Sequence, residues 1–322
     1  IESDPAAANE CREEAAIIKR LAPQCVDETG GLFVAVKGDD ENYIADFPGR
    51  CQRCGIFATV VDPTDAQEME PSLSDDVIAA YAVEDASIDP FKLSLDNLAQ
   101  AGELGTRQLL HHQGVGFDRQ GRKIVAVRLV DRRHGVDVHV HADQIVNASG
   151  AWAGEVAAMA GARINMVYSQ GSLIVSQLRL GERVINRLRT AADADILVPA
   201  GTVSIFGTTS KRIDAPDKCR PTTAEIDAMI HDGMVMIPKL ADTRYIRAYA
   251  GVRPLVKSGS GADDRAVSRG FSLVDHEAEN LDNFITITGG KLTTYRLMAE
   301  KTADRVCRRL GVTQSCRTAA EP

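Results

Sequence analysis

A strand-like run that ends abruptly in two glycines is the feature that most constrains how this chain folds. Residues 284–288 predict a buried strand, Gly289 and Gly290 follow it, and an amphipathic helix is predicted from Lys291 to Leu310. Glycines open the backbone to a flat ligand, and the free N–H groups of a first helical turn favour an anion. The spacing is not that of a Walker A loop. The segment therefore predicts an anion or a cofactor at this helix N-terminus.

A second junction of this kind lies in the middle of the chain. A strand predicted at 144–148 ends in Ser149-Gly150, and a helix predicted at 151–160 follows at once, with the only tryptophan, Trp152, in its first turn. Small residues let a bulky ligand approach the backbone. A plain strand-to-helix turn has the same pattern, and Trp152 is compatible with core packing alone. Gly114-Val115-Gly116 lies between strands and is too short for a dinucleotide fingerprint.

Helices and strands are expected on both sides of a central β-meander. Turns at 118–121 and 132–135, each ending in glycine, separate meander strands expected at 107–117, 123–131 and 136–141. Helices are expected at 8–22, 41–54, 63–71, 90–102, 151–160, 223–237 and 291–310. Further strands are expected at 31–36, 58–61, 77–83, 144–148, 164–178, 196–198, 203–207, 244–252, 271–274 and 284–288.

The charge balance argues against one class of partner. The chain has 37 Lys and Arg against 45 Asp and Glu, a net charge of −8, which argues against nucleic acid as the main partner. Its apolar runs are strand-sized, too short for a transmembrane helix. The first residues lack the basic start and apolar core of a signal peptide. The chain opens with Ile1 and not with Met, so we expect a piece of a longer protein.

Cysteines and histidines give little support to a metal site. The seven cysteines are scattered, as in reduced cytosolic proteins, and do not suggest a disulfide frame. Cys51 and Cys54 form a CxxC pair without the second pair that zinc needs, so we interpret them as helix cysteines. His139 and His141 would share one face of a strand, which suits a metal or, equally, the solvated face of a hairpin. No metal is predicted.

Two arginines lie close to predicted strand ends. Arg253 precedes Pro254, which is expected to end a strand, and Arg269 precedes the strand predicted at 271–274. The segment 257–264 between them is the best candidate for a mobile loop. The planar fork of an arginine binds two oxygens of a carboxylate or a phosphate at once. A surface salt bridge is the alternative for each.

Five motifs occur in this order along the chain: VNASGAW, SIFGTTS, AYAGVRPL, VSRG and ITGGKLTTYRLMAE. The ordered set resembles the FAD-dependent glycerol-3-phosphate dehydrogenases, and the likeness runs from about Ala7 to Leu310. Leu173 follows Gly171-Ser172 where aerobic members carry a histidine, so the likeness is to the anaerobic branch. The resemblance implies a mixed α/β fold of the D-amino-acid-oxidase type. In it, an incomplete Rossmann-like FAD-binding domain (1–25, 84–162 and 271–312) is interleaved with a mixed-sheet substrate domain (26–83 and 163–270).

The same resemblance implies a reaction and its residues. Hydride passes from C2 of sn-glycerol 3-phosphate to flavin N5, giving dihydroxyacetone phosphate, and electrons pass through electron-transfer subunits to a quinone. Arg253 and Arg269 match the phosphate clamp, and Lys291 lies near the reacting centre. Thr208 and Thr209 match hydroxyls that face the substrate. The residues expected to bind FAD are Gly114, Ala148, Ser149, Gly150, Trp152, Gly289, Gly290, Lys291, Leu292 and Thr293. A clamp must converge, so Arg253, Arg269 and Lys291 are expected around one pocket.

Two other interpretations stay open. The same fold could oxidise another small anion, such as an amino acid or a 2-hydroxy acid, or this chain could be a non-catalytic fragment. The GxGxxG segment with which the family cradles the FAD pyrophosphate has no counterpart here. We therefore expect this chain alone to hold no ordered FAD and to be inactive. The intact enzyme is expected in the cytoplasm, at the inner face of the cell membrane through its partner subunits.

Overall fold

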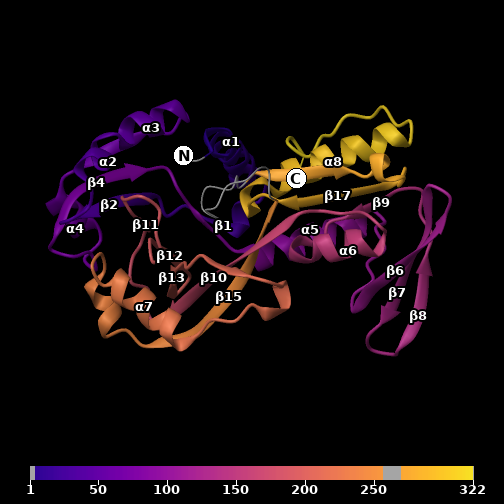
Figure 1. Ribbon diagram of the computed structural model, residues 1–322. Helices are drawn as coiled ribbons and strands as arrows, with labels where there is room; N and C mark the ends of the chain where they lie inside the picture. Colours follow the sequence, from indigo (N-terminus) through magenta and orange to yellow (C-terminus); the bar gives the residue numbers. More distant parts are fainter. Residues whose placement is uncertain (1–3, 257–269, 322) are drawn as a thin grey trace. The chain divides into compact units, whose positions relative to one another are not determined.

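The computed structural model of the protein describes residues 4–256 and 270–321 (Figure 1). Contacts divide the chain into two compact units, each built from separate stretches of sequence. Of the described residues, the first unit contains 4–90 and 168–253, and the second contains 91–167, 254–256 and 270–321. Residues 4–25 group with the first unit, whereas the segment 1–25 was predicted in the FAD-binding domain. The functional division of the chain into FAD-binding and substrate domains stays a prediction.

A mixed sheet of nine strands forms the centre of the first unit. Its strands are β2 (Gly31–Val36), β3 (Ala58–Val61), β4 (Val77–Val83), β10 (Met166–Ser176), β11 (Val184–Arg187), β12 (Ile196–Ala200), β13 (Val203–Gly207), β14 (Lys211–Ile213) and β15 (Tyr245–Val256). The order is β14-β10-β13-β12-β11-β2-β4-β3, and β15 pairs with β10. β2 pairs in parallel with β11 and antiparallel with β4. Its side chains are buried on both faces, which explains its continuous apolar sequence.

Helices and turns complete the first unit. They are α1 (Pro5–Leu21), α2 (Glu41–Ala45), α3 (Phe47–Arg53), α4 (Pro63–Met69), α7 (Thr223–Gly233), η1 (Pro23–Cys25), η3 (Pro216–Lys218) and η4 (Pro238–Ala241), beside the two-stranded pair β1 (Val26–Asp27) and β5 (Ser87–Ile88). The predicted start of α4 is confirmed, because the Asp62 carboxylate accepts a hydrogen bond from the N–H of Thr64 at 2.8 Å. Thr222 caps α7 in the same way, accepting from the N–H of Glu225 at 3.2 Å.

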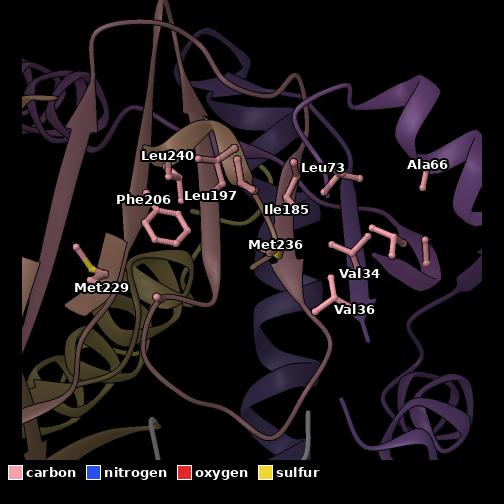
Figure 2. Close-up of a cluster of buried hydrophobic side chains, with 14 of the residues drawn as sticks. Val34, Val36, Ala66, Leu73, Ile185, Leu197, Phe206, Met229, Met236 and Leu240 are labelled. Atoms are coloured by element: carbon pink, nitrogen blue, oxygen red, sulfur yellow. The ribbon is translucent and has the colours of Figure 1, made fainter. Parts of the chain in front are cut away.

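The core of the first unit lies between the sheet and the segment from α7 to η4 (Figure 2). The Phe206 ring is 2% exposed and belongs to the same cluster as Leu197 and Leu240. A Cβ built on Gly233 would lie 2.8 Å from Leu240 and would collide with the Phe206 ring. The end of α7 can approach β13 this closely only because residue 233 has no side chain.

The second unit contains two three-stranded sheets. Its strands are β6 (His112–Gln120), β7 (Lys123–Asp131), β8 (Val136–Val140), β9 (Ile145–Asn147), β16 (Phe271–Asp275) and β17 (Phe284–Gly289). Its helices and turns are α5 (Pro90–Glu103), α6 (Ala153–Met159), α8 (Tyr295–Arg309), η2 (Gly150–Trp152), η5 (Glu277–Glu279) and η6 (Leu292–Thr294). β6, β7 and β8 form the predicted antiparallel meander, and the other sheet has the order β16-β17-β9 (Figure 1).

The side chain of Asn283 connects the two sheets of the second unit. Its amide accepts a hydrogen bond from the N–H of Ile124 at 2.9 Å and donates one to the carbonyl of Ile124 at 2.8 Å. The rings of Phe117 and Phe284 meet nearly edge to face, with their centroids 5.6 Å apart. The meander and the sheet that contains β17 therefore share one small core.

Several element boundaries differ from the sequence prediction. β15 was expected to end before Pro254 but continues to Val256. It pairs with β10 alone in the described sheet, and an edge strand tolerates the missing N–H of a proline. β6 starts at His112 and runs to Gln120, so the turn shifts to Gly121 and Arg122. The short strand β11 was not predicted at all.

The cysteine and histidine pairs play ordinary structural roles. Cys51 and Cys54 are buried thiols at the end of α3, and Cys51 belongs to a core cluster with Phe47. His139 contacts the Asp118 carboxylate at 3.1 Å, and His141 contacts the Val125 carbonyl at 2.8 Å. Among residues 4–256 and 270–321, no group of three His, Cys, Asp or Glu could hold a metal ion. The same residues contain no helix long and apolar enough to span a membrane.

Candidate functional site

The parallel pairing of β9 and β17 brings the two predicted cofactor segments together. Asn147 lies opposite Thr286, so the carboxyl ends of both strands meet at one edge of the sheet. At this edge the Thr288 hydroxyl donates a hydrogen bond to the carbonyl of Gly150 at 3.3 Å. Ligands of α/β sheets commonly bind at the carboxyl ends of the strands. Ser149-Gly150 and Gly289-Gly290 therefore lie at the same candidate site.

Asn147 determines the shape of the turn that follows β9. Its side chain is 4% exposed and donates hydrogen bonds to the carbonyl of Ala153 at 2.9 Å and to the Thr286 hydroxyl at 3.2 Å. It accepts a hydrogen bond from the Ser149 hydroxyl at 2.5 Å. The fully buried His276 contacts Thr286 from the other side, at 2.9 Å. This buried network holds the turn in one conformation. None of these hydrogen bonds involves Gly150.

The glycine turn after β17 needs both of its glycines. Gly289 and Gly290 have φ angles of +78° and +75°. A Cβ on Gly289 would lie 2.9 Å from the carbonyl oxygen of Gly270, and one on Gly290 would lie 2.6 Å from the sulfur of Met298. η6 and α8 begin directly afterwards. The turn thus presents the N-terminus of a helical segment beside the carboxyl end of β17, as the sequence predicted.

The other predicted cofactor residues differ in their exposure and in whether they lie next to the two turns. Ala148 and Lys291 are exposed, Leu292 is 41% exposed and Thr293 is half-buried, all next to the two turns. Trp152 is 44% exposed, which excludes a fully buried core position. Gly114 lies within β6, opposite Leu129, in a different sheet from the other candidates. The structure brings together all the predicted FAD-binding residues except Gly114.

A second group of predicted residues lies in the first unit, around Arg253. One guanidinium nitrogen donates to the carbonyl of Thr209 at 3.1 Å, and the other contacts the Thr208 hydroxyl. A Cβ built on Gly171 would lie 2.7 Å from the guanidinium carbon. The Thr208-Thr209 turn and Gly171 together therefore orient the planar fork of Arg253.

The predicted convergence of the three basic residues stays a prediction. Arg269 lies outside the described residues. Arg253 belongs to the first unit and Lys291 to the second.

Sequence reasoning missed Glu225 entirely. Its half-buried carboxylate accepts hydrogen bonds from the hydroxyls of Ser172 and Thr209, both at 2.6 Å. Thr222 and Glu225 stand three residues apart, a pattern that signals a helix start and not a site. Burial alone raises the pKa of Glu225, but hydrogen bonds from Ser172, Thr209 and Gln170 together hold the pKa of the carboxyl below its ordinary value.

This lowered pKa predicts an acid-sensitive contribution to stability. A carboxyl whose pKa is lower in the folded state stabilises the fold above its ordinary pKa of 4.5, and the stabilisation is lost as pH falls through the folded value. Glu225→Gln lacks this contribution. We expect the melting temperatures of wild type and Glu225→Gln to approach each other as pH is lowered from 7 toward 3. A constant difference across that range would contradict the prediction.

Comparison with known proteins agrees with this architecture. The family model of the FAD-dependent oxidoreductases matches residues 6–305. The chain belongs to the FAD-dependent oxidoreductase family. It is 44% identical over 320 residues to a subunit of the anaerobic glycerol-3-phosphate dehydrogenase of Escherichia coli K12, covering 98% of this chain and 59% of that protein. It is 40% identical over 333 residues to a subunit of the anaerobic enzyme of Haloferax volcanii, covering 99% of this chain and 57% of the relative. The chain thus spans less than two thirds of the length of these relatives.

Solved structures show the same fold. L-proline dehydrogenase from P. horikoshii aligns with a TM-score of 0.74 at 19% identity, over 95% of this chain and 79% of the other. Glycerol-3-phosphate dehydrogenase from Bacillus halodurans, complexed with FAD, aligns with a TM-score of 0.71 at 22% identity. The alignment covers 96% of this chain and 57% of the other. The mixed α/β fold predicted from the sequence is confirmed as that of the FAD-dependent oxidoreductases.

The candidate site of this FAD-dependent oxidoreductase fits its family's cofactor. Gly150 has a φ of +58°, and a Cβ built on it would meet no atom within 4 Å, so its backbone faces open space. The N-terminus of the segment that begins at Leu292 favours negative charge, which the flavin carries once it is reduced. Ser149, Gly150, Gly290 and Lys291 lie at these two turns and stay the predicted FAD-binding residues.

Gly289 offers a direct test of this turn in the FAD-dependent oxidoreductase. A side chain at positive φ costs about 1–2 kcal/mol, and Gly289→Ala also meets the backbone oxygen of Gly270. In the intact enzyme, we expect Gly289→Ala to lower the melting temperature and to weaken FAD binding, measured by flavin fluorescence. Gly121→Ala is the matched control, because Gly121 also has positive φ but lies in a hairpin turn with open space around it. Equal FAD affinities in the two variants would argue against a cofactor role for Gly289.

Proposed function

We propose that the intact enzyme to which this chain belongs oxidises sn-glycerol 3-phosphate to dihydroxyacetone phosphate with FAD as the hydride acceptor. The likeness over 98% of the chain to a protein named as part of an anaerobic glycerol-3-phosphate dehydrogenase carries the proposal. The oriented guanidinium of Arg253 supports it, since a phosphate dianion binds best to a planar arginine fork.

Each of the predicted functional residues has a distinct task in this proposal. Arg253 and Arg269 bind the phosphate, and Thr208 faces the substrate beside Arg253. Lys291 and the helix start that follows it stabilise negative charge near the reacting centre. When bound, FAD supplies the redox chemistry by accepting hydride from C2 at its N5 atom. The protein itself binds and orients the substrate.

We further propose partner subunits as the electron route. The relatives are themselves named as subunits of a dehydrogenase, which supports an assembly with other chains. Electrons would leave through such subunits to a quinone, with the enzyme at the inner face of the cell membrane.

Substrate selectivity tests the proposed function. The intact FAD-loaded enzyme is assayed with a redox dye as acceptor and with sn-glycerol 3-phosphate, glycerol, L-lactate or L-proline as donor. We expect turnover with sn-glycerol 3-phosphate alone, because only it carries the dianion that the arginines bind. Preference for L-lactate or L-proline would favour oxidation of a carboxylate substrate instead. Equal turnover of glycerol would rule out the phosphate clamp.

A further inference from the structure

We propose that Glu225 is the positioning residue of the phosphate-binding arginine, acting through the Thr208-Thr209 turn. The inference rests on the proposed function, because it assigns Arg253 to the substrate phosphate. Glu225 itself contacts hydroxyl and amide groups of the protein, and its influence on the substrate is indirect.

One carboxylate oxygen of Glu225 joins strand β10 to the segment that follows β13. Oε1 accepts from the hydroxyl of Ser172 in β10 and from the hydroxyl of Thr209, just after β13, each at 2.6 Å. The N–H of Ser172 also donates to the Thr209 hydroxyl at 3.0 Å. Ser172 is fully buried and Thr209 is 5% exposed. Hydrogen bonds to an ionised acceptor are roughly twice as strong as those between neutral groups. The carboxylate therefore holds Thr209 firmly against β10.

The Thr208-Thr209 turn, held by Glu225, orients the guanidinium of Arg253. The carbonyl of Thr209 accepts from Arg253 at 3.1 Å and from the Thr208 hydroxyl at 2.8 Å, and that same hydroxyl contacts the second guanidinium nitrogen. Gly171 directly precedes Ser172 in the chain and lies against the guanidinium. The Thr208-Thr209 segment and Gly171, which both contact the Arg253 fork, are thus attached to residues that Glu225 binds. A shift of Thr209 or of β10 must turn the fork.

Glu70, a carboxylate that pairs with the guanidinium of Arg183 at 3.3 Å, provides a control. It is 1% exposed and accepts from the N–H groups of Glu182, at 3.0 Å, and Arg183, at 2.9 Å, within the same unit. No hydrogen bond of Glu70 to the Thr208-Thr209 turn is found among the described residues. Glu70→Gln therefore measures the general cost of neutralising a buried carboxylate.

The test combines steady-state kinetics with a double-mutant cycle in the FAD-loaded enzyme. We expect Glu225→Gln to raise KM for sn-glycerol 3-phosphate roughly 5- to 50-fold with kcat changed less than about twofold. Glu70→Gln should leave KM within about twofold at a similar loss of thermal stability. In the Arg253→Ala background, the further effect of Glu225→Gln on KM should fall below about twofold. Thr209→Val, which removes the Thr209 hydroxyl that donates to Glu225, should reproduce the KM effect and serves as the second variant if Glu225→Gln fails to fold.

The outcomes separate two failures. A wild-type enzyme without turnover of sn-glycerol 3-phosphate contradicts the proposed function. Two results with an active wild type contradict only the role of Glu225. One is that the effects of Glu225→Gln and Arg253→Ala on the free energy derived from KM are additive, and the other is that Glu70→Gln raises KM as much as Glu225→Gln does.

Discussion

Arg253→Ala is expected to raise KM for sn-glycerol 3-phosphate by about 10- to 150-fold, since removing a charged hydrogen-bond partner costs roughly 1.5–3 kcal/mol. Thr208 and Thr209 already orient the guanidinium, so binding the phosphate costs little further side-chain entropy. Initial-rate measurements on the FAD-loaded enzyme give the change directly.

Arg253→Lys separates charge from geometry. Lysine keeps the positive charge but loses the planar fork, so its KM should lie between those of wild type and Arg253→Ala. Unchanged melting temperatures in both variants would show that the effect belongs to substrate binding. A KM change below twofold in Arg253→Ala would refute the assignment of Arg253 as a clamp.

Phe206→Ala is expected to lower the free energy of unfolding by about 3–5 kcal/mol. The ring is 2% exposed and lies in the cluster that joins the sheet to α7 and η4 (Figure 2). Because Gly233 and Leu240 pack directly against this region, the surrounding structure can collapse only partly into the cavity. Urea unfolding followed by circular dichroism measures the loss.

Phe57→Ala is the control for this substitution. Phe57 is 90% exposed, so its removal should change stability by less than about 0.5 kcal/mol. Similar losses in Phe57→Ala and Phe206→Ala would mean that Phe206 contributes no more than a surface ring.

Local patterns predicted most of the elements because they depend on neighbouring residues only. The strand at 31–36 is apolar throughout and appears as β2 with the same bounds, and the strand at 203–207 appears as β13. The two glycine turns at the ends of β9 and β17 were also recognisable, since small residues between a strand and a helix carry their own signal. The resemblance then connected turns that are far apart in the sequence.

Features that depend on distant partners could not be predicted in this way. β11 has only four residues, and its pairing with β2 across the sheet stabilises it as a strand. Glu225 looks like an ordinary helix-start residue, and its contact with Ser172 spans 53 residues. The continuation of β15 through Pro254 depends on its place at the edge of the described sheet. Each of these positions acquires its role from tertiary contacts that leave no periodic pattern.

The parallel pairing of β9 with β17 has a consequence for how the protein is made. Asn147 and Thr286 touch across 139 residues of chain. At a synthesis rate of 5–20 residues per second, roughly 7–28 s pass between the appearance of one strand and the arrival of the other. Throughout this interval β9 lacks the neighbour that satisfies its backbone on that side, and unpaired strand edges promote aggregation. The edge that would bind the cofactor is completed only after β17 has left the ribosome, so a lower growth temperature and added chaperone should improve the yield of folded protein.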